Sequence, residues 1–344
     1  MKCSFKNDYS EGCHGKILDV LTSTNLESQD GYGEDEYTQK AKKLIQKKMN
    51  NFESDIYFVS GGTQANLIVV SSALRPYESV ISAESGHINI HEAGSIEAVG
   101  HKINTIQSSD GKIKVEDIKA VLYEHNEAPH VVKPKMVYIS NSTELGTIYK
   151  KDELTKLSKF CKENELYLFM DGARLGSALC SKDNDLTLKD LAKLLDIFYI
   201  GGTKNGALLG EAIVINNDEL KKDFTYNLKQ KGALMSKGRV LGIQFATLFE
   251  DNLFFELANH ANSMAQKIAK SIQKYGFTFL CKPQTNQIFP ILPNILIDKL
   301  EKQFDFYVWK KVDEDNSAIR IVTSWATKES AADEIIDFIM DKYQ

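Results

Sequence analysis

Between Asp55 and Ile215 the sequence alternates between short apolar runs and longer segments whose apolar residues recur at helical spacing. The apolar runs are of strand length and comprise Asp55–Val59, Ser79–Ser82, Met136–Ser140, Tyr167–Asp171 and Ile197–Ile200. A helix between two such strands returns the chain to begin the next strand in the same direction. The alternation therefore predicts an α/β fold with a mostly parallel sheet and helices on both of its faces.

The pattern changes after about Val240, where a long helical segment, Leu248–Lys274, precedes several short strand-like runs. Those runs are Phe277–Lys282, Gln287–Leu292, Phe304–Trp309 and Ile319–Thr323, and a last helix is expected over Ser330–Tyr343. This order of elements is typical of an α+β unit. We therefore expect an N-terminal arm over residues 1–15, a large domain over 16–245 and a smaller C-terminal domain over 246–344.

Composition excludes several classes of partner. The chain has 344 residues with 42 Lys and Arg against 47 Asp and Glu, so its net charge of −5 gives no electrostatic reason to bind nucleic acid or anionic membranes. No apolar stretch approaches the ~18 residues of a membrane span, and the N-terminus lacks the apolar core of a signal peptide. Five scattered cysteines without a Cys-x-x-Cys pair favour reduced thiols in a cytoplasmic protein.

Two of the predicted strands end in residues that could react or bind charge. The run ending at Ile200 continues into Gly201-Gly202-Thr203-Lys204, and the earlier run ends at Asp171 and is followed by Arg174. Because the carboxyl ends of parallel strands meet at one edge of a sheet, these side chains should share the edge where ligands bind. A partly desolvated lysine has a lowered pKa, which suits it to Schiff-base formation with a carbonyl compound.

Other residues could complete such a site. Asp55–Val59 is followed by Ser-Gly-Gly-Thr, with Gly62 and Thr63 at the start of a predicted helix, where backbone N–H groups can bind an anion.

His87 and His91 are four residues apart, so a metal pair must be considered. No Cys or Asp lies at ligand spacing nearby, and a metal-dependent hydrolase built on His87, His91 and Glu92 would leave the lysine strand and Arg174 unexplained. We therefore expect no metal; instead His87 would stack over a flat cofactor, with His91 structural. Arg320 alternates with two isoleucines and could face the same cleft.

Together these residues meet the requirements of pyridoxal phosphate acting on an amino acid. A phosphate would lie at the Gly-Gly-Thr turn, and a lysine would condense with the aldehyde. An aspartate would keep the pyridine nitrogen protonated, and arginines would grip a carboxylate in bidentate fashion. Each feature is weak evidence alone, but their order along one α/β chain favours this cofactor.

The sequence resembles the low-specificity threonine aldolases of the beta-eliminating lyase/threonine aldolase group, which are fold type I, aspartate-aminotransferase-like enzymes that use pyridoxal phosphate. The matching motifs are YGED (Tyr32–Asp35), SGGTQAN (Ser60–Asn66), GHINIHEAG (Gly86–Gly94), MDGAR (Met170–Arg174), GGTKNG (Gly201–Gly206) and IRIVTSW (Ile319–Trp325). The resemblance covers essentially the whole chain. It implies a cytoplasmic lyase of amino acid metabolism that forms a homodimer or homotetramer, with active sites shared between subunits.

The resemblance also implies roles for individual residues. Lys204 corresponds to the lysine that carries the cofactor, Asp171 to the partner of the pyridine nitrogen, and His87 to the stacking ring. The other implied residues are Gly62 and Thr63 at the phosphate, Lys229 at the phosphate of a neighbouring subunit, Arg174 and Arg320 at the substrate carboxylate, Tyr32 at the substrate, and His130 near the substrate hydroxyl. One departure is Asn7, which stands where many members have a substrate-binding serine, so it is expected to take over that hydrogen bond.

The function implied is retro-aldol cleavage of L-threonine and L-allo-threonine to glycine and acetaldehyde. The base that removes the β-hydroxyl proton stays open among His87, His130 and an ordered water. Another reaction on the same scaffold is the alternative, namely that of a β-eliminating lyase, an aminotransferase or a racemase. All of these would use Lys204 and Asp171, so the two residues cannot separate them. A binding protein that lost the reaction is disfavoured because none of the reactive residues is missing.

Overall fold

The computed structural model describes residues 2–343, and its centre is a seven-stranded sheet with the strand order β2-β8-β7-β6-β5-β3-β4. The strands are β2 (Asp55–Val59), β3 (Glu78–Ala83), β4 (Ile103–Ile106), β5 (Lys133–Ser140), β6 (Tyr167–Asp171), β7 (Ile197–Gly201) and β8 (Glu211–Ile215). From β7 to β4 all neighbouring strands are parallel, and β8 pairs antiparallel with both β7 and β2. The prediction of a mostly parallel sheet is confirmed.

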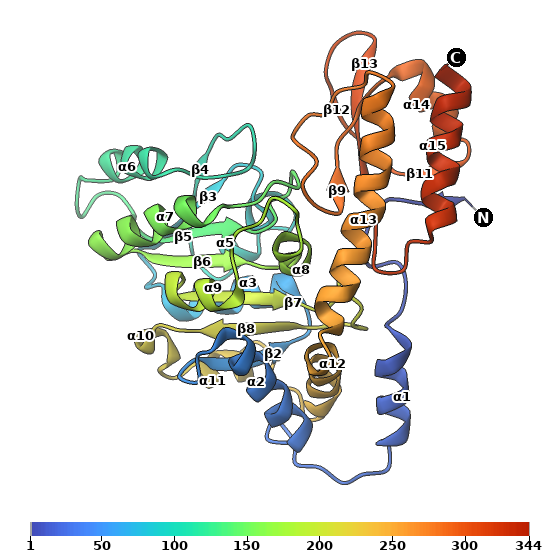
Figure 1. The fold of residues 1–344 in the computed structure, drawn as a ribbon. Coiled ribbons are helices and arrows are strands. Elements are labelled where there is room, and N and C mark those ends of the chain that lie inside the picture. Colours follow the sequence, from blue (N-terminus) through green and yellow to red (C-terminus); the bar gives the residue numbers. More distant parts are fainter. Residues whose placement is uncertain (1, 344) are drawn as a thin grey trace.

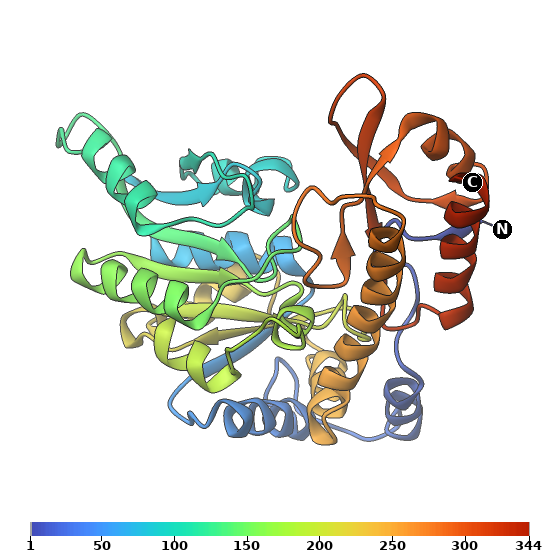
Figure 2. The same ribbon diagram turned by 45° about the horizontal axis from the view of Figure 1, so that its top comes forward.

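Helices cover both faces of this sheet (Figures 1 and 2). Alternate residues of one strand point to opposite faces: Val137 and Ile139 of β5 belong to one apolar core, and Met136 and Tyr138 to the other. The first core is closed by α2 (Glu36–Met49), α6 (Val115–Glu124), α7 (Lys151–Glu163), α9 (Leu188–Leu194) and α12 (Arg239–Glu250). The second is closed mainly by α3 (Gly62–Ala73), α5 (Ser95–Ala98), α10 (Asp218–Lys221) and α11 (Phe224–Gln230). Because both faces are covered, the open edge at the strand ends is where a ligand can enter.

The C-terminal part forms a smaller unit with its own apolar core. It contains the second half of α13 (Leu253–Lys274), the strands β9 (Gln287–Ile288), β10 (Ile291–Pro293), β11 (Phe304–Asp305), β12 (Tyr307–Lys311) and β13 (Asn316–Val322), and the helices α14 (Asn294–Leu300) and α15 (Glu329–Tyr343). The arm joins this unit, because β1 (Cys3–Ser4) pairs with β11 and Phe5 lies in its core. Both chain ends therefore lie on the small unit (Figure 1). The short helices α1 (Gly15–Ser23), α4 (His87–Ile90) and α8 (Leu175–Leu179) complete the chain.

Four predicted elements differ from the structure. The runs Gln287–Leu292 and Phe304–Trp309 are each divided into two short strands, β9 and β10 in the first and β11 and β12 in the second. The single helix expected over Leu248–Lys274 is two helices, because the chain turns at Asn252, which has φ of 61° in the left-handed region. The run Phe277–Lys282 is not a strand but makes one isolated bridge, between Phe279 and Pro290.

The change from one core to the other takes place within α13. Leu253 and Leu257 pack in a core of the large sheet, whereas Met264 and Ile268 pack in the small unit. The domain boundary expected after residue 245 falls inside α12, before the helix in which the core changes. Although α13 is 22 residues long, no helix of the described chain is both long and apolar enough to cross a membrane.

Candidate active site

Two neighbouring cavities lie at the carboxyl-end edge of the large sheet. The inner cavity, of about 280 Å³, is lined by the ends of β2, β5, β6 and β7. The outer cavity, of about 490 Å³, opens toward the small unit and is lined by residues that include Trp309 and Arg320. Five residues line both cavities, namely Tyr9, His87, Glu144, Arg174 and Lys204. The two cavities are therefore parts of one site, with Lys204 at their junction.

Asp171 lies at the buried end of β6, on the inner cavity. Its Oδ2 accepts hydrogen bonds from the Tyr138 hydroxyl at 2.6 Å and from Asn66 Nδ2 at 3.2 Å, and its Oδ1 accepts one from the Ala173 backbone at 2.9 Å. Burial alone would raise the pKa of this carboxyl, but the hydrogen bonds from Tyr138 and Tyr199 outweigh it and lower the pKa. The site thus holds a fixed carboxylate at its base.

Lys204 follows β7 after a turn that needs small residues, because a Cβ on Gly202 would lie 2.8 Å from the Gly210 carbonyl oxygen. The lysine is only partly exposed, and desolvation together with the positive charge of Arg174 lowers the pKa of its amine. A lowered pKa keeps a larger share of the amine neutral, which is the form that attacks a carbonyl group. Beside it, burial raises the pKa of Glu211, at the start of β8, to about 8, although the charge of Lys204 opposes the rise.

His87 begins α4 and is oriented by a buried carboxylate. Its Nδ1 lies 2.7 Å from Oε1 of Glu92, and the same oxygen accepts a hydrogen bond from Asn66 Nδ2 at 2.6 Å. Asn66 also donates to Asp171, so hydrogen bonds connect the imidazole to the base of the site. His91 is exposed, with its ring centroid 5.6 Å from that of His87. Among the described residues no group of three His, Cys, Asp or Glu side chains could hold a metal ion.

The turn between β2 and α3 forms one wall of the inner cavity, through Ser60, Gly61, Gly62 and Thr63. Gly61 precedes α3 and provides no side-chain cap, so the first N–H groups of this helix remain available. A Cβ on Gly62 would lie 3.0 Å from the Tyr199 hydroxyl oxygen, which explains the need for glycine there. Free N–H groups at the N-terminus of a helix bind anions well.

Two arginines reach the site from different units. Arg174 Nε and Nη2 donate to the two oxygens of Asp8, at 2.7 and 2.9 Å, and Asp8 is only 1% exposed. Arg320 Nη2 donates to the Lys6 carbonyl, and its buried Nε has no partner within the described residues. Burial and the charge of Arg174 lower the pKa of Arg320. Arg174 is paired with Asp8, whereas Arg320 forms no salt bridge within the described residues. The excess positive charge at this position favours binding of an anionic substrate group.

The structure places His130 elsewhere. This residue is exposed in the turn before β5 begins, whereas the two cavities lie where β5 ends. Since β5 is eight residues long, the strand separates His130 from the site by roughly 25 Å, at about 3.3 Å per residue. The expectation that His130 approaches the substrate is therefore wrong within a single chain, because its loop lies at the opposite edge of the sheet.

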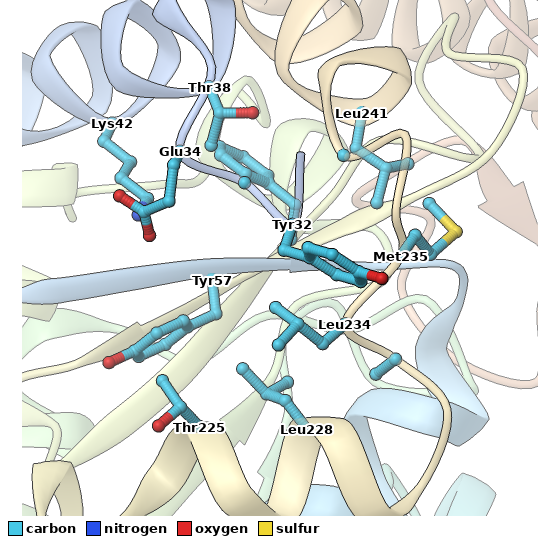
Figure 3. A pocket seen from close by; sticks show the side chains of 14 residues that line it. Tyr32, Glu34, Thr38, Lys42, Tyr57, Thr225, Leu228, Leu234, Met235 and Leu241 are labelled. Carbon is cyan, nitrogen blue, oxygen red and sulfur yellow. The ribbon is translucent and has the colours of Figure 1, made fainter. Parts of the chain in front are cut away.

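Three other predicted residues also lie outside both cavities. Asn7 does not line them; its Oδ1 accepts hydrogen bonds from Tyr9 N and Ser10 Oγ, and it is the next residue, Asp8, that binds Arg174. Tyr32 lines a separate, largely apolar cavity between α2, α11 and residues 233–241 (Figure 3). Lys229, on α11, lies with its Nζ 4.4 Å from the centre of the Tyr32 ring.

Sequence reasoning missed most of the residues that hold the predicted ones in place. These are Asp8 at Arg174, Glu92 and Asn66 at His87, Tyr138 and Tyr199 at Asp171, and the carboxyls Glu144 and Glu211. One signal was available: Glu211 comes five residues after the end of the lysine motif and begins an otherwise apolar run. The others become partners only through contacts between distant parts of the chain.

Comparisons with known proteins agree with this geometry. The sequence model of the beta-eliminating lyase family matches residues 15–293. A low-specificity L-threonine aldolase from Pseudomonas sp. (strain NCIMB 10558) is 33% identical over 338 residues, covering 96% of this chain and 95% of the relative. A solved structure of threonine aldolase from Leishmania major is 48% identical with a TM-score of 0.97, covering 99% of this chain and all of the other (100%).

The fold itself is more widespread. An aromatic aminotransferase from Pyrococcus horikoshii OT3 superposes with a TM-score of 0.71 at 14% identity, covering 99% of this chain and 95% of that structure. At such low identity the likeness concerns the fold alone. It confirms the prediction of an aminotransferase-like fold of type I.

Proposed function

The chain belongs to the beta-eliminating lyase family, and on this premise we propose that it is a pyridoxal-phosphate-dependent lyase that cleaves L-threonine and L-allo-threonine to glycine and acetaldehyde. One observation carries the proposal: Lys204 stands at the junction of two cavities, with the Asp171 carboxylate in the inner one and two guanidinium groups at the outer one. The likeness to threonine aldolases along nearly the whole chain supports this choice of reaction.

The residues present fit pyridoxal phosphate. Lys204 would hold its aldehyde carbon, Asp171 its ring nitrogen, and the N–H groups of Gly62 and Thr63 its phosphate. The buried hydroxyl of Ser142, which also lines the inner cavity, has no hydrogen-bond partner within the described chain. An unpaired buried hydroxyl costs free energy, so this orphan group is explained if a polar ligand fills the cavity.

When bound, the cofactor links to the substrate amine and accepts the electron pair that Cα releases. The protein contributes position and charge. Arg174 and Arg320 would bind the substrate carboxylate, and Asp8 fixes the Arg174 guanidinium so that its plane is set before substrate arrives. His87, oriented by Glu92, presents its ring to the cavity. Holding the carboxylate at one point sets the direction of the Cα–Cβ bond, which is the bond that must break.

The function is tested by following the absorption spectrum of the purified protein while each of L-threonine and L-allo-threonine is added, with assays for acetaldehyde and glycine. We expect an absorption band near the visible edge that shifts with substrate, and both products in equal amounts, because cleavage produces one of each. Serine and alanine serve as controls. A cofactor spectrum with pyruvate or racemised alanine, but no acetaldehyde, would instead assign the protein to β-elimination, transamination or racemisation.

We further propose that the enzyme is a homo-oligomer, a dimer or tetramer, in which Lys229 reaches the phosphate region of a neighbouring subunit and Tyr32 reaches the substrate bound there. Both residues lie outside the two cavities of the site in their own chain. Tyr32, in the separate cavity of Figure 3, is 49% exposed. Lys229 is exposed as well, with its Nζ 4.4 Å from the centre of the Tyr32 ring. Two exposed side chains held together by a cation–π contact are better explained by an external partner than by the packing of this chain.

Complementation between inactive subunits tests this arrangement. Lys204→Ala and Lys229→Ala subunits, each impaired alone, should regain activity when co-expressed, because a hybrid oligomer contains one site with both lysines intact. In a randomly assembled dimer the recovery should be about a quarter of wild type, since isologous pairing forms half hybrids with one good site each. Separately purified variants mixed just before assay are the control. Co-expressed hybrids no more active than that mixture would disprove the shared site.

The cellular location follows as a smaller proposal. All five cysteines are free in the structure, and we place the enzyme in the cytoplasm, where thiols stay reduced.

A further inference from the structure

Among the residues that the structure describes, Glu144 is the single carboxyl that lines both cavities of the site. It lies four residues after the end of β5, and it shares the junction with Tyr9, His87, Arg174 and Lys204. Of these four neighbours, Arg174 is held by Asp8, and Lys204 is assigned to the cofactor. The proposed function gives Glu144 no role, although a carboxyl at this junction faces the space where substrate would lie.

Glu144 is held in a defined orientation. Its Oε1 accepts a hydrogen bond from the backbone N–H of His87 at 3.0 Å and another from Ser140 Oγ at 2.7 Å. Both donors reach the same oxygen, the backbone N–H of Glu144 itself also donates to the carboxyl, and within residues 2–343 no other residue is seen to donate to Oε2. One oxygen therefore anchors the side chain while the other remains available to a ligand.

The charges around Glu144 show that it is not a structural ion-pair partner. No lysine or arginine of the described chain forms a salt bridge with it, and Arg174, the cation that acts on it through space, is paired with Asp8. The other titratable groups that act on it are Asp171, Tyr138 and Tyr149. Burial, and then the negative charge of Asp171, raise the pKa of Glu144. A carboxylate whose pKa is raised toward neutrality is a stronger base than an ordinary one.

The other groups considered for proton transfer are less suited. His130 lies at the opposite edge of the sheet, and Nδ1 of His87 is already bound to Glu92. His87 retains only Nε2, on a ring whose proposed place is over the cofactor. Glu144, by contrast, accepts a hydrogen bond from the backbone of His87 and also lines the outer cavity, as Arg320 does.

We propose that Glu144 is the general base that accepts the β-hydroxyl proton of the substrate during cleavage. The inference rests on the proposed aldolase function. The carboxylate takes the proton, and the O–H electron pair becomes the second bond of the aldehyde carbonyl. The Cα–Cβ bond breaks with its electron pair remaining on the glycine fragment, and acetaldehyde leaves. Glu144 then returns its proton to solvent, and Cα of the glycine fragment takes up one proton, which completes glycine. In the synthetic direction the same group, protonated, donates to the forming alkoxide.

Two activities of the holoenzyme separate this role from others. Cleavage of threonine needs a base at the β-hydroxyl, whereas exchange of the α-protons of glycine with D₂O, followed by NMR, involves no hydroxyl. Glu144→Gln keeps the size of the side chain and an oxygen that can accept the two hydrogen bonds. We expect it to lose about 10²- to 10⁴-fold in kcat for cleavage, the usual contribution of a general base. Glycine exchange should stay within about threefold of wild type, since that step does not use this base.

Further variants guard against a merely structural effect. Glu144→Asp, which keeps the carboxyl, should recover part of the cleavage that Glu144→Gln loses. Glu78→Gln, at a buried glutamate where β3 begins, should leave both activities unchanged. In wild type, kcat/KM for cleavage should decrease as the pH is lowered through the pKa of Glu144, because the protonated carboxyl cannot accept a proton. This decrease should occur at a higher pH than for an ordinary glutamate, and Glu144→Gln should not show it.

Each result is decisive. Cleavage by Glu144→Gln near the wild-type rate would overturn the proposal. Parallel loss of cleavage and glycine exchange would also overturn it, because the residue would then act on the cofactor or the fold. A wild-type enzyme that exchanges glycine but releases no acetaldehyde would refute the aldolase function itself, and the inference with it. Loss of cleavage with retained exchange, and partial rescue by aspartate, would establish Glu144 as the base.

Discussion

Lys204→Ala is expected to abolish turnover and to remove the absorption band of the bound cofactor. Within the described part of the chain the lysine is the one amine at the junction of the two cavities, and its lowered pKa favours the neutral form that condenses with an aldehyde. Loss of a residue that forms a covalent bond in catalysis typically costs roughly four orders of magnitude or more in kcat. Both readouts should fail together, because in the proposed function the same amine would hold the cofactor.

Borohydride reduction gives an independent measurement. In wild type it should fix a phosphopyridoxyl group on a peptide that contains Lys204, as seen by mass spectrometry, and in the variant no stoichiometric adduct should form. Lys189→Ala, at an exposed lysine of α9, is the matched control and should behave as wild type. Turnover retained by Lys204→Ala, or an adduct located mainly on another lysine, would contradict the assignment.

Asp171→Asn is expected to produce the second-largest loss. The carboxylate is surrounded by donors from Tyr138, Asn66 and Ala173, so an amide would turn its NH₂ group toward at least one donor. It would also remove the negative charge that keeps a ring nitrogen protonated. Breaking a buried charge pair costs about 3–5 kcal/mol, which corresponds to about 10²- to 10⁴-fold in kcat.

A milder substitution at the same place distinguishes charge from packing. Tyr138→Phe removes one hydrogen bond to the carboxylate, and such bonds contribute about 1.5–3 kcal/mol. Its kcat should therefore fall less than that of Asp171→Asn, while the cofactor spectrum is kept. Thermal melting of both variants checks that the fold remains. An Asp171→Asn enzyme with wild-type kcat would show that the carboxylate is not the partner of the ring nitrogen.

Much of the fold could be predicted because its signals are local. The strand runs and the glycine turns that follow them are read from a few consecutive residues, and the carboxyl ends of parallel strands always meet at one edge. The sequence alone therefore predicts that Asp171 and Lys204 share one edge of the sheet. The break between α12 and α13 was missed, because Asp251-Asn252 interrupts the helical pattern without a glycine or proline.

Partners that come from distant segments could not be predicted. Asp8 meets Arg174 across 166 positions of sequence, and Asn286 donates to the same aspartate from the small unit. These contacts depend on the arm crossing to pair with β11, which no periodicity in the first residues indicates. His130 shows the opposite error: a match to a family motif does not say at which end of a strand the residue lies.

The sequence by itself determined the α/β architecture, the reactive residues at the strand ends and the family. These follow from spacing within short segments and from the geometry of parallel strands. Only the tertiary structure decided which groups set the charge states of those residues. It paired Asp8 with Arg174 and Glu92 with His87, and it left Glu144 at the junction of both cavities without a counter-ion. The physical reason is that burial and charge act over a few ångströms of space, and the path of the chain decides which residues share that space.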